Sequence, residues 1–350
     1  MNPPLRVAVI GAGVMGRHHA NVYRLLPDVE LVALVEPDAR RRQEAEQQFG
    51  CPVYPDSLTL LASTRFDAAS LAAPTTVHHT ITQSLLEACV HVLVEKPVAT
   101  RVDDARRLAA MSRDRGLVLQ VGHITRFFRA IERLRAEVGR PYLIEARRLT
   151  PNGRIQDVGV VLDLMIHDID IVLGLVRQPV VDVAVAGHTV GAGRHEDVCA
   201  AQVRFADGCV ARFLASRVAP DAERSLVVAD AHRTFRLDFA KDPHTEMTVY
   251  RPAPAEAAER RADGDDAHDE DFAVGAGGIA SHILVDRHVV FEDNPLRKQL
   301  AHFITRIRGG ADPIGTLEDD IRSLSLAQEL LVRLERQGSP RVAHVAAPTA

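Results

Sequence analysis

Residues 5–16 have the sequence LRVAVIGAGVMG, an apolar run followed directly by a glycine-rich turn. Leu5 to Ile10 has the aliphatic and β-branched composition of a strand that is buried on both faces of a parallel sheet. A helical stretch over 17–26 follows the turn, so the glycines stand where a βαβ unit has its phosphate loop. In such a loop the first glycine permits a tight turn, the second lets the backbone approach a pyrophosphate, and the third lets the helix pack closely on the strand. We therefore predict that the whole turn binds a dinucleotide: Gly11, Ala12, Gly13, Val14, Met15 and Gly16.

The next predicted strand, Glu30 to Val35, is followed by an acidic residue, Glu36. A carboxylate at this place, about twenty residues beyond the glycines, holds the adenosine ribose hydroxyls and repels a 2′-phosphate, which favours NAD over NADP. Arg40 and Arg41 follow on a predicted helix over 38–49, where they either soften that preference or form its solvated face. The predicted cofactor is therefore NAD, with NADP not excluded.

Strand-like and helix-like segments continue to alternate as far as residue 121. The predicted strands lie at 52–54, 67–72, 92–94 and 117–121, and the predicted helices at 57–63, 76–89 and 102–115. This alternation predicts a Rossmann-type α/β domain, a doubly wound parallel sheet with ligands at the carboxyl ends of its strands. Three segments follow such ends, and we expect them to share one cofactor crevice: the glycine turn, Ala73-Pro74-Thr75 with His78, and Glu95-Lys96-Pro97.

After His123 the pattern changes to a predicted helix over 127–138, a strand over 142–149 and a helix over 161–175. The alternating runs 198–205 and 210–216, joined by Ala206-Asp207-Gly208, predict a hairpin, and 226–230 is expected to pair with 235–239. These elements predict an α+β domain with an open, mostly antiparallel sheet. We accordingly assign residues 1–122 to the dinucleotide-binding domain, 123–337 to a substrate and oligomerisation domain with closing helices at 296–308 and 317–336, and 338–350 to a disordered tail.

The length and composition of the 350 residues agree with a soluble enzyme and argue against several other classes of function. A net charge of −5 gives no electrostatic basis for binding nucleic acid or an anionic membrane. No apolar run reaches membrane-spanning length, so we expect a cytoplasmic protein. The four cysteines lack C-x-x-C spacing, which argues against a zinc site and against a disulfide framework. The acidic run 263–271 does not match a calcium loop, and we expect it to be a mobile surface excursion.

The predicted helix over 161–175 carries ionisable residues on an otherwise apolar background. Asp163, His167 and Asp170 are spaced i, i+4 and i+7, so they share one face of the helix. Such groups must be paired, liganded or lining a cleft. Oxidation of a secondary alcohol needs a base poised near neutral pH, which fits His167, with Asp163 orienting its imidazolium and Lys96 favouring the developing alkoxide. A histidine paired within the core, or a metal site on the same face, would explain the pattern as well; Lys96 disfavours a metal, and none is predicted.

The glycine turn, Ala73-Pro74-Thr75, Glu95-Lys96-Pro97 and Asp163-x-x-x-His167-Asp168, in this order, resemble the motifs of the glucose–fructose oxidoreductase, inositol dehydrogenase and MocA (Gfo/Idh/MocA) family. The resemblance covers nearly the whole chain. It implies that Lys96, Asp163 and His167 form the catalytic set. It also implies a Rossmann domain followed by a domain with an open sheet, through which two or four copies assemble into a homodimer or homotetramer.

Two further segments are similar to the family branch that contains UDP-N-acetylglucosamine 3-dehydrogenases: Val121-Gly122-His123-x-x-Arg126-Phe127, and 153–160 with the sequence GRIQDVGV. Phe128 and Arg129 depart from the Asn-Pro with which that branch continues. The resemblance implies a UDP-sugar substrate, used for lipid A or polysaccharide biosynthesis. Arginine forks match diphosphate oxygens, so Arg126 and Arg154 are either substrate ligands or ordinary surface arginines. Gln156 would contact a sugar hydroxyl or cap a turn, and the complete predicted substrate set is Lys96, Arg126, Arg154, Gln156, Asp163, His167 and Asp170.

Three functions therefore remain open. The first is an NAD-dependent dehydrogenase of a UDP-linked amino sugar, and the second is a dehydrogenase of a free sugar or polyol such as an inositol. The third is a catalytically silent dinucleotide-binding regulator, which the same fold can support. The intact set Lys96, Asp163 and His167 argues against the regulator, because a sensor does not require all three.

Overall fold

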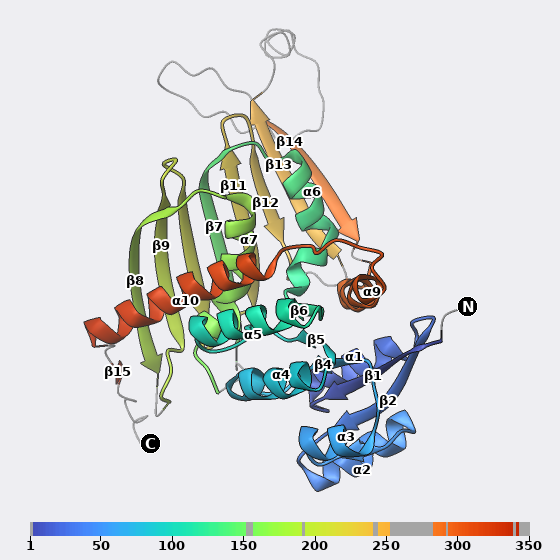
Figure 1. Ribbon diagram of the computed structural model, residues 1–350. Helices are drawn as coiled ribbons and strands as arrows, with labels where there is room; N and C mark the ends of the chain where they lie inside the picture. The colour runs from blue at the N-terminus through green and yellow to red at the C-terminus, as the bar shows by residue number, and fades with distance from the viewer. Residues whose placement is uncertain are drawn as a thin grey trace, which may run out of the picture. The chain divides into compact units, whose positions relative to one another are not determined.

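The computed structural model describes residues 3–151, 157–190, 193–240, 244–252, 283–291 and 293–338, together with the backbone of 341–342. The chain divides into two compact units that interleave along the sequence (Figure 1). The first contains Met1–Phe127, Arg154–Gly174 and Asp293–Arg336; the second contains Phe128–Gly153, Leu175–Glu292 and Gln337–Ala350. The domains predicted from the sequence are continuous along the chain, whereas these units are not. The helix that carries Asp163 and the two closing helices thus belong to the same unit as the N-terminal sheet.

The first unit contains a six-stranded sheet in which every neighbouring pair is parallel. Its order β3-β2-β1-β4-β5-β6 is that of a dinucleotide-binding sheet and confirms the predicted fold class. The strands are β1 (Leu5–Ile10), β2 (Val29–Val35), β3 (Val53–Tyr54), β4 (Ala68–Leu71), β5 (His91–Val94) and β6 (Leu119–Val121).

The helices of this unit are α1 (Val14–Tyr23), α2 (Ala39–Phe49), α3 (Ser57–Ser63), α4 (His78–Glu87), α5 (Val102–Asp114), α7 (Ile166–Leu175), α9 (Pro295–Ile307) and α10 (Leu317–Gln337). Three shorter elements complete it: the 3₁₀ turns η1 (Thr75–Val77) and η2 (Ile124–Phe127), and the π-helical turn η3 (Val161–Met165). The predicted helix over 161–175 therefore starts with wider turns than an α-helix has.

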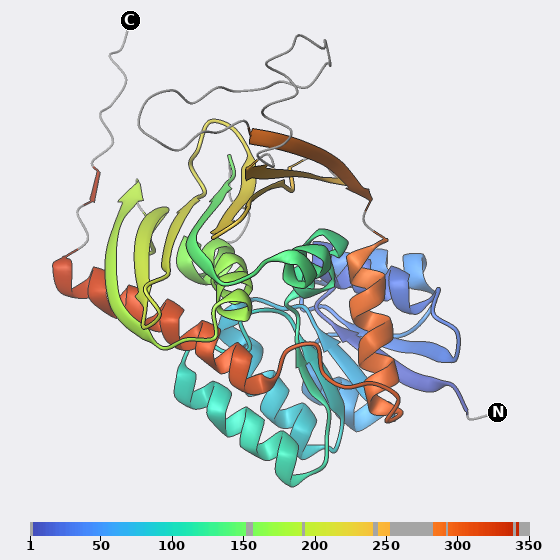
Figure 2. The same ribbon diagram turned by 90° about the horizontal axis from the view of Figure 1, so that it is seen from above.

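A buried core joins the parallel sheet to α1, α2 and α9, with Tyr23, Leu34 and Phe303 at its centre. Helix α10 lies alongside α5 in both ribbon views (Figures 1 and 2). The side chain of Gln328 accepts a hydrogen bond from the backbone N–H of Val102, and Glu318 pairs with Arg113. The closing helices thus extend the first unit on two sides of its sheet.

The second unit contains a nine-stranded sheet in the order β14-β13-β12-β11-β7-β10-β9-β8-β15. The β7–β10 and β8–β15 pairs are parallel and the others are antiparallel, as predicted for an open, mostly antiparallel sheet. Its strands are β7 (Pro141–Leu149), β8 (Val180–Val190), β9 (Val198–Phe205), β10 (Val210–Ser216), β11 (Glu223–Asp230), β12 (Thr234–Asp238), β13 (His244–Pro252), β14 (Ile283–Phe291) and β15 (Arg341–Val342). Among the described residues of this unit, helix α6 (Arg129–Glu137) accompanies them.

The predicted hairpin β9–β10 and the pairing of β11 with β12 are confirmed. Strands β8 and β14 are absent from the sequence-based prediction, although β8 alternates buried and exposed side chains from Asp182 to Val190. Strand β15 forms a short pair within the predicted tail. The remaining tail residues after Gly338 and the acidic run 263–271 lie outside the described residues.

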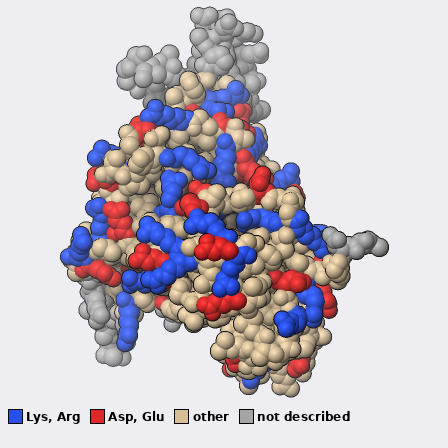
Figure 3. Space-filling view, viewed as in Figure 1, with Lys and Arg blue, Asp and Glu red and all other residues tan. Residues whose placement is uncertain are grey.

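Cross-strand ion pairs cover part of this sheet, among them Arg147–Glu223, Arg212–Glu145 and Arg251–Asp286. Basic and acidic side chains are also interspersed on the face shown in Figure 3. Of the helices in the described residues, none is long and apolar enough to cross a membrane.

Candidate functional site

Two of the glycines in the turn between β1 and α1 are required by the packing of the protein itself. Gly11 has φ +97°, and a Cβ there would lie 2.5 Å from the carbonyl oxygen of Ala72 at the end of β4. A Cβ on Gly16 would lie 1.6 Å from the carbonyl oxygen of Gly11. Gly13 is different, because a Cβ there would meet no atom within 4 Å. The open space at Gly13 is where the predicted pyrophosphate would approach the backbone.

The N-terminus of α1 fits an anion at that place. Gly13 is its N-cap and supplies no side-chain hydrogen bond, so the first N–H groups of the helix have no side-chain acceptor. The side chains of Val14 and Met15 are exposed and leave the backbone accessible. Arg17 donates a hydrogen bond from Nε to the carbonyl oxygen of Ala12 at 3.0 Å, which fixes the turn. The residues of this turn therefore fit a bound dinucleotide diphosphate.

Glu36 follows β2 and is buried beside the same turn. Its two carboxylate oxygens accept hydrogen bonds from the backbone N–H groups of Ala12, at 3.2 Å, and Asp38, at 3.1 Å. These two hydrogen bonds hold Glu36, the residue predicted to bind the ribose, against the glycine turn. Arg40 pairs with Glu44 on the exposed side of α2.

The segments after β4 and β5 are joined by His78. Its Nδ1 lies 2.8 Å from the carbonyl oxygen of Pro97, and its Nε2 lies 2.9 Å from that of Ala73. Burial lowers the pKa of this imidazole, although the two carbonyls oppose the shift. The residue is 1% exposed and both ring nitrogens face backbone carbonyls, so His78 holds the two segments together, and this geometry does not support a direct polar contact with the cofactor.

A buried hydrogen-bonded chain lies behind Glu95 and was not predicted. The hydroxyl of Tyr23 lies 3.0 Å from Ser70 Oγ, which lies 2.9 Å from His19 Nδ1, and His19 Nε2 lies 3.1 Å from Glu95 Oε1. Burial acts to raise the pKa of Glu95, but His19 and Lys96 outweigh it and the pKa is lowered. His19 thus links Ser70 to Glu95, and each polar group of the chain has a hydrogen-bond partner. The sequence signal for this chain was the pair of polar residues His19 and Tyr23, which lie on the same buried face of α1 as Gly16.

Lys96 and Asp163 meet beside this chain. Lys96 Nζ donates to the backbone carbonyl of Asp163 at 2.7 Å and lies 3.2 Å from its carboxylate Oδ1. The two side chains are only 12% and 10% exposed. The π-helical turn η3 places this carbonyl and this carboxylate on the same ammonium group. His167 follows four residues later, half-buried on α7.

Asp170 does not share that environment. Its carboxylate receives two hydrogen bonds from Arg126, from Nε at 2.9 Å and from Nη2 at 2.5 Å, and Ser323 Oγ donates to it at 3.2 Å. Arg126 Nη2 also donates to Asp320 at 2.6 Å. The guanidinium and the carboxylate are buried and satisfied within the protein, so this geometry does not support the substrate-binding roles predicted for Arg126 and Asp170. Asp320 lies far along the sequence and was missed.

The charges of this buried cluster are strongly coupled. Burial raises the pKa of Asp320 to about 7. Burial also acts to raise the pKa of Asp170, but His123 and Arg126 bring it down to about 2. His123, Asp170 and Asp320 have metal-ligand atoms within 4.8 Å of one another, yet both carboxylates already bind the Arg126 guanidinium. That guanidinium supplies the positive charge that a metal ion would bring.

The two remaining predicted substrate residues, Arg154 and Gln156, lie outside the described residues. The structure thus brings together the glycine turn, Glu36, the segments after β4 and β5, Lys96 and Asp163 in the first unit. Their arrangement suits the binding of a dinucleotide, with the Lys96 ammonium group placed at the reactive end of the site.

A matched pair of variants tests the fit of the turn to a dinucleotide. We expect Gly13→Ala to leave thermal stability unchanged and to weaken NAD binding about ten- to hundredfold, because the new methyl group enters the open space beside the helix terminus. Gly16→Ala should instead lower the melting temperature, since its Cβ collides with the backbone of Gly11. Calorimetric titration with NAD and thermal melting separate the two effects; equal NAD affinity in Gly13→Ala and wild type would contradict the assignment.

Two family models match the chain. Residues 5–123 match the Gfo/Idh/MocA model described as an oxidoreductase family with an NAD-binding Rossmann fold, and residues 130–236 match the Gfo/Idh/MocA C-terminal domain. A UDP-N-acetylglucosamine 3-dehydrogenase of Acidithiobacillus ferrooxidans is 35% identical over 237 residues, which are 67% of this chain and 74% of that protein. The chain belongs to the Gfo/Idh/MocA family.

Other members of the family differ in the substrates that their names give. An Escherichia coli D-glucoside 3-dehydrogenase is 32% identical over 51% of this chain and 56% of that protein. An inositol 2-dehydrogenase of Rubrobacter xylanophilus is 31% identical over 52% of this chain and 55% of that protein. A solved structure of the Acidithiobacillus ferrooxidans enzyme superimposes with a TM-score of 0.81 at 28% identity, covering 96% of this chain and 99% of that chain.

This Gfo/Idh/MocA protein is therefore an NAD(P)-dependent dehydrogenase that acts on CH–OH groups of sugars or polyols, as its motifs predicted. The family model and the geometry of the glycine turn agree on the dinucleotide cofactor.

Proposed function

We propose that this enzyme oxidises the C3 hydroxyl of UDP-N-acetylglucosamine or of a related UDP-sugar, with Lys96, Asp163 and His167 as its catalytic residues. The observation that carries the proposal is the Lys96 ammonium group, which is nearly buried and held by two oxygens of Asp163. A fixed positive charge at the end of a strand in a dinucleotide-binding sheet suits the oxygen of an alcohol that is losing hydride.

Each of the three residues has a distinct part in the proposed reaction. Bound nicotinamide supplies the hydride acceptor. The substrate hydroxyl loses its proton to the imidazole of His167, because an imidazole accepts protons near neutral pH. Lys96 donates a hydrogen bond to the same oxygen and stabilises its developing negative charge. Asp163 holds Lys96 in place through two of its oxygens, while its predicted contact with the His167 imidazolium stays a prediction.

The proposal of a UDP-sugar as substrate depends on the similarity of this chain to named dehydrogenases and on Arg154. The relative with 35% identity and the structure with a TM-score of 0.81 both bear the name UDP-N-acetylglucosamine 3-dehydrogenase. Arg126 is bound internally, so Arg154 is the remaining candidate among the predicted arginines for the diphosphate. A free polyol is the second candidate substrate, because inositol dehydrogenases are also similar to this chain.

Turnover of the purified enzyme, measured with NAD and with NADP, decides between a UDP-sugar and a free polyol as the substrate. The panel contains UDP-N-acetylglucosamine, other UDP-sugars, myo-inositol and glucose, with a carbonyl trap to draw an uphill oxidation forward. Mass spectrometry should find a product lighter by two hydrogens from a UDP-sugar alone. Turnover of free polyols alone would move the enzyme to the second candidate, and NAD binding without any turnover would support the silent regulator.

Arg154 gives a sharper prediction for the same site. We expect Arg154→Ala to raise the KM for the UDP-sugar about tenfold or more with little change in kcat, because a charge-assisted contact to a diphosphate binds substrate and transition state alike. Arg212→Ala, which removes an exposed partner of Glu145, is the matched control. An unchanged KM, or an equal loss with a free sugar, would exclude a diphosphate site at Arg154.

A further inference from the structure

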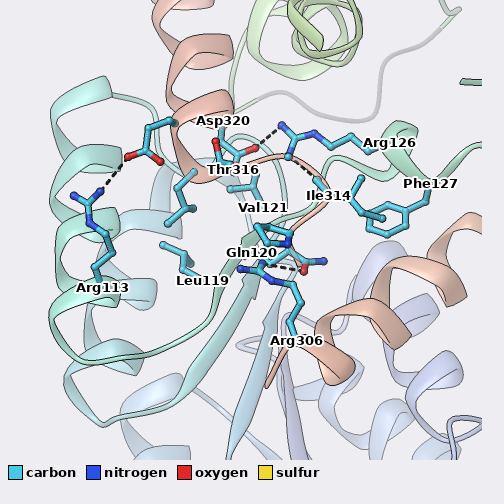
Figure 4. A pocket seen from close by; sticks show the side chains of 14 residues that line it. Arg113, Leu119, Gln120, Val121, Arg126, Phe127, Arg306, Ile314, Thr316 and Asp320 are labelled. Atoms are coloured by element: carbon cyan, nitrogen blue, oxygen red, sulfur yellow. Dashed lines mark hydrogen bonds and ion pairs between the residues drawn. The ribbon is translucent and has the colours of Figure 1, made fainter. Parts of the chain in front are cut away.

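A pocket lies within the first unit, between the end of β6, the C-terminal part of α9 and the start of α10 (Figure 4). Its volume is about 170 Å³, enough for about five water molecules. The polar side chains that line it are those of Arg113, Gln120, Arg126, Arg306, Thr316, Glu318 and Asp320. None of the residues predicted to bind the dinucleotide lines this pocket.

The three arginines of the pocket wall differ in their ionic partners. Arg113 pairs with Glu318 at 3.0 Å, and Arg126 pairs with Asp320 at 2.6 Å. Among the described residues, no carboxylate lies within 4.0 Å of Arg306. Its guanidinium instead donates from Nη1 to the amide oxygen of Gln120 at 3.3 Å, a neutral acceptor at the long end of the hydrogen-bonding range. In the described part of the chain, Arg306 is thus the arginine of this wall that has a neutral hydrogen-bond acceptor in place of an ionic partner.

Arg306 is also half withdrawn from water. Burial lowers the pKa of its guanidinium, and only the more distant charge of Asp320 opposes that shift. A cation removed from water is destabilised unless an anion or several hydrogen bonds compensate it. A negatively charged ligand in this pocket would therefore compensate the guanidinium of Arg306, and the pocket has room for one.

The wall around Arg306 is firmly built. Gln120 is 8% exposed, and its Nε2 lies 3.4 Å from the carbonyl oxygen of Gln299, which turns its Oε1 toward Arg306. On the opposite wall the loop before α10 packs directly on Arg126. Gly315 in this loop has φ +82°, and a Cβ there would lie 2.2 Å from Nη1 of Arg126. Arg126 in turn donates to the carbonyl of Ile314. The side chains that would meet a ligand are thus fixed in place by neighbours on three different elements.

We propose that this pocket binds a small oxyanion, a carboxylate or a phosphate, through the guanidinium of Arg306. An arginine fork matches two oxygens of such a group, and the size of the pocket admits a molecule of a few heavy atoms. Arg113 also lines this pocket, from α5, where its guanidinium is paired with Glu318. The site is distinct from the proposed catalytic residues and does not depend on which sugar the enzyme oxidises.

Calorimetric titration of the NAD-saturated enzyme with sodium phosphate and, separately, with sodium malonate tests the proposal. Saturating NAD keeps either anion out of the phosphate loop, and a sodium chloride titration at equal ionic strength corrects for screening. We expect saturable binding of at least one anion, and Arg306→Gln should weaken it about tenfold or more. Arg308→Gln is the matched control, because Arg308 stands at the end of the same helix and pairs with Asp28; it should bind as wild type does.

The two anions distinguish a phosphate ligand from a carboxylate ligand by which of them binds more tightly. Arg113→Gln provides a second variant that removes only a surface ion pair, and it should weaken binding by a smaller factor. Absence of saturable binding with both anions would overturn the proposal. Binding that Arg306→Gln and Arg113→Gln leave unchanged, or that occurs only without NAD, would overturn it as well.

Discussion

Replacing Lys96 by Met is expected to lower kcat about 10³-fold while NAD binding stays within about twofold of wild type. Methionine keeps much of the length and apolar volume of the lysine stem but removes the charge that Asp163 holds in place. The loss should fall on kcat more than on KM, because the proposed contact becomes strong only when the substrate oxygen gains negative charge. Single-turnover measurement of NADH formation, with calorimetric titration of NAD, checks both parts.

Two further variants make the Lys96 result specific. Lys298→Met, on α9, removes a lysine charge away from the proposed site and should retain full turnover. Lys96→Arg keeps the charge but not the compact ammonium group, and we expect intermediate activity. Turnover of Lys96→Met near the wild-type rate would disprove the catalytic role, and a parallel loss of NAD binding would show that Lys96 mainly supports the cofactor.

Replacing Arg126 by Met is expected to cause the largest loss of stability. Arg126 is 5% exposed, and its guanidinium binds the carboxylates of Asp170 and Asp320, which are buried as well. Removing the cation leaves two carboxylates facing each other without compensation, a change that typically costs about 3–5 kcal/mol. In a unit of this size the melting temperature should fall on the order of 10 °C. Thermal melting followed by circular dichroism measures the effect.

The loss of stability in Arg126→Met should depend on pH. The pKa of Asp320 is raised from its ordinary 3.8 to about 7 in the folded protein, so the folded state binds this proton more tightly than the unfolded state does. Its contribution to stability is therefore full at low pH and is lost as the pH rises through about 7. Asp170, with a pKa lowered to about 2, stays ionised over this window in the wild type. The deficit of the variant should accordingly be smaller near about pH 5.5 than near about pH 8.

Arg113→Met is the matched control for Arg126. Arg113 pairs with Glu318, and both side chains are more than half exposed. Its removal should change stability by less than about 1 kcal/mol and show no comparable dependence on pH. If Arg126→Met melted within about 2 °C of Arg113→Met, the buried cluster would not have the stabilising role described here.

The first sheet and its cofactor turn could be predicted because their signals are local. The run Leu5 to Ile10 and the spacing of Gly11, Gly13 and Gly16 are fixed by short-range sterics, and the structure reproduces them. The hairpin β9–β10 was equally local, since its turn contains Gly208 with φ +91°. Strand β14 was missed, because its pairing with β13 joins segments separated by some thirty residues and its sequence alone carries no turn signal.

The sequence by itself determined the chemistry that this protein has available: the phosphate loop, the acidic residue after β2, and Lys96, Asp163 and His167 in their order. Only the tertiary structure decided which of these groups are free to act. Asp163 and Asp170 are equivalent in a helical pattern, yet the π-helical turn brings Asp163 to Lys96, whereas Asp170 is bound by Arg126. Helical spacing cannot distinguish them, because the partners that separate their roles, Lys96, Arg126 and Asp320, come from distant parts of the chain and meet only when the first unit is folded.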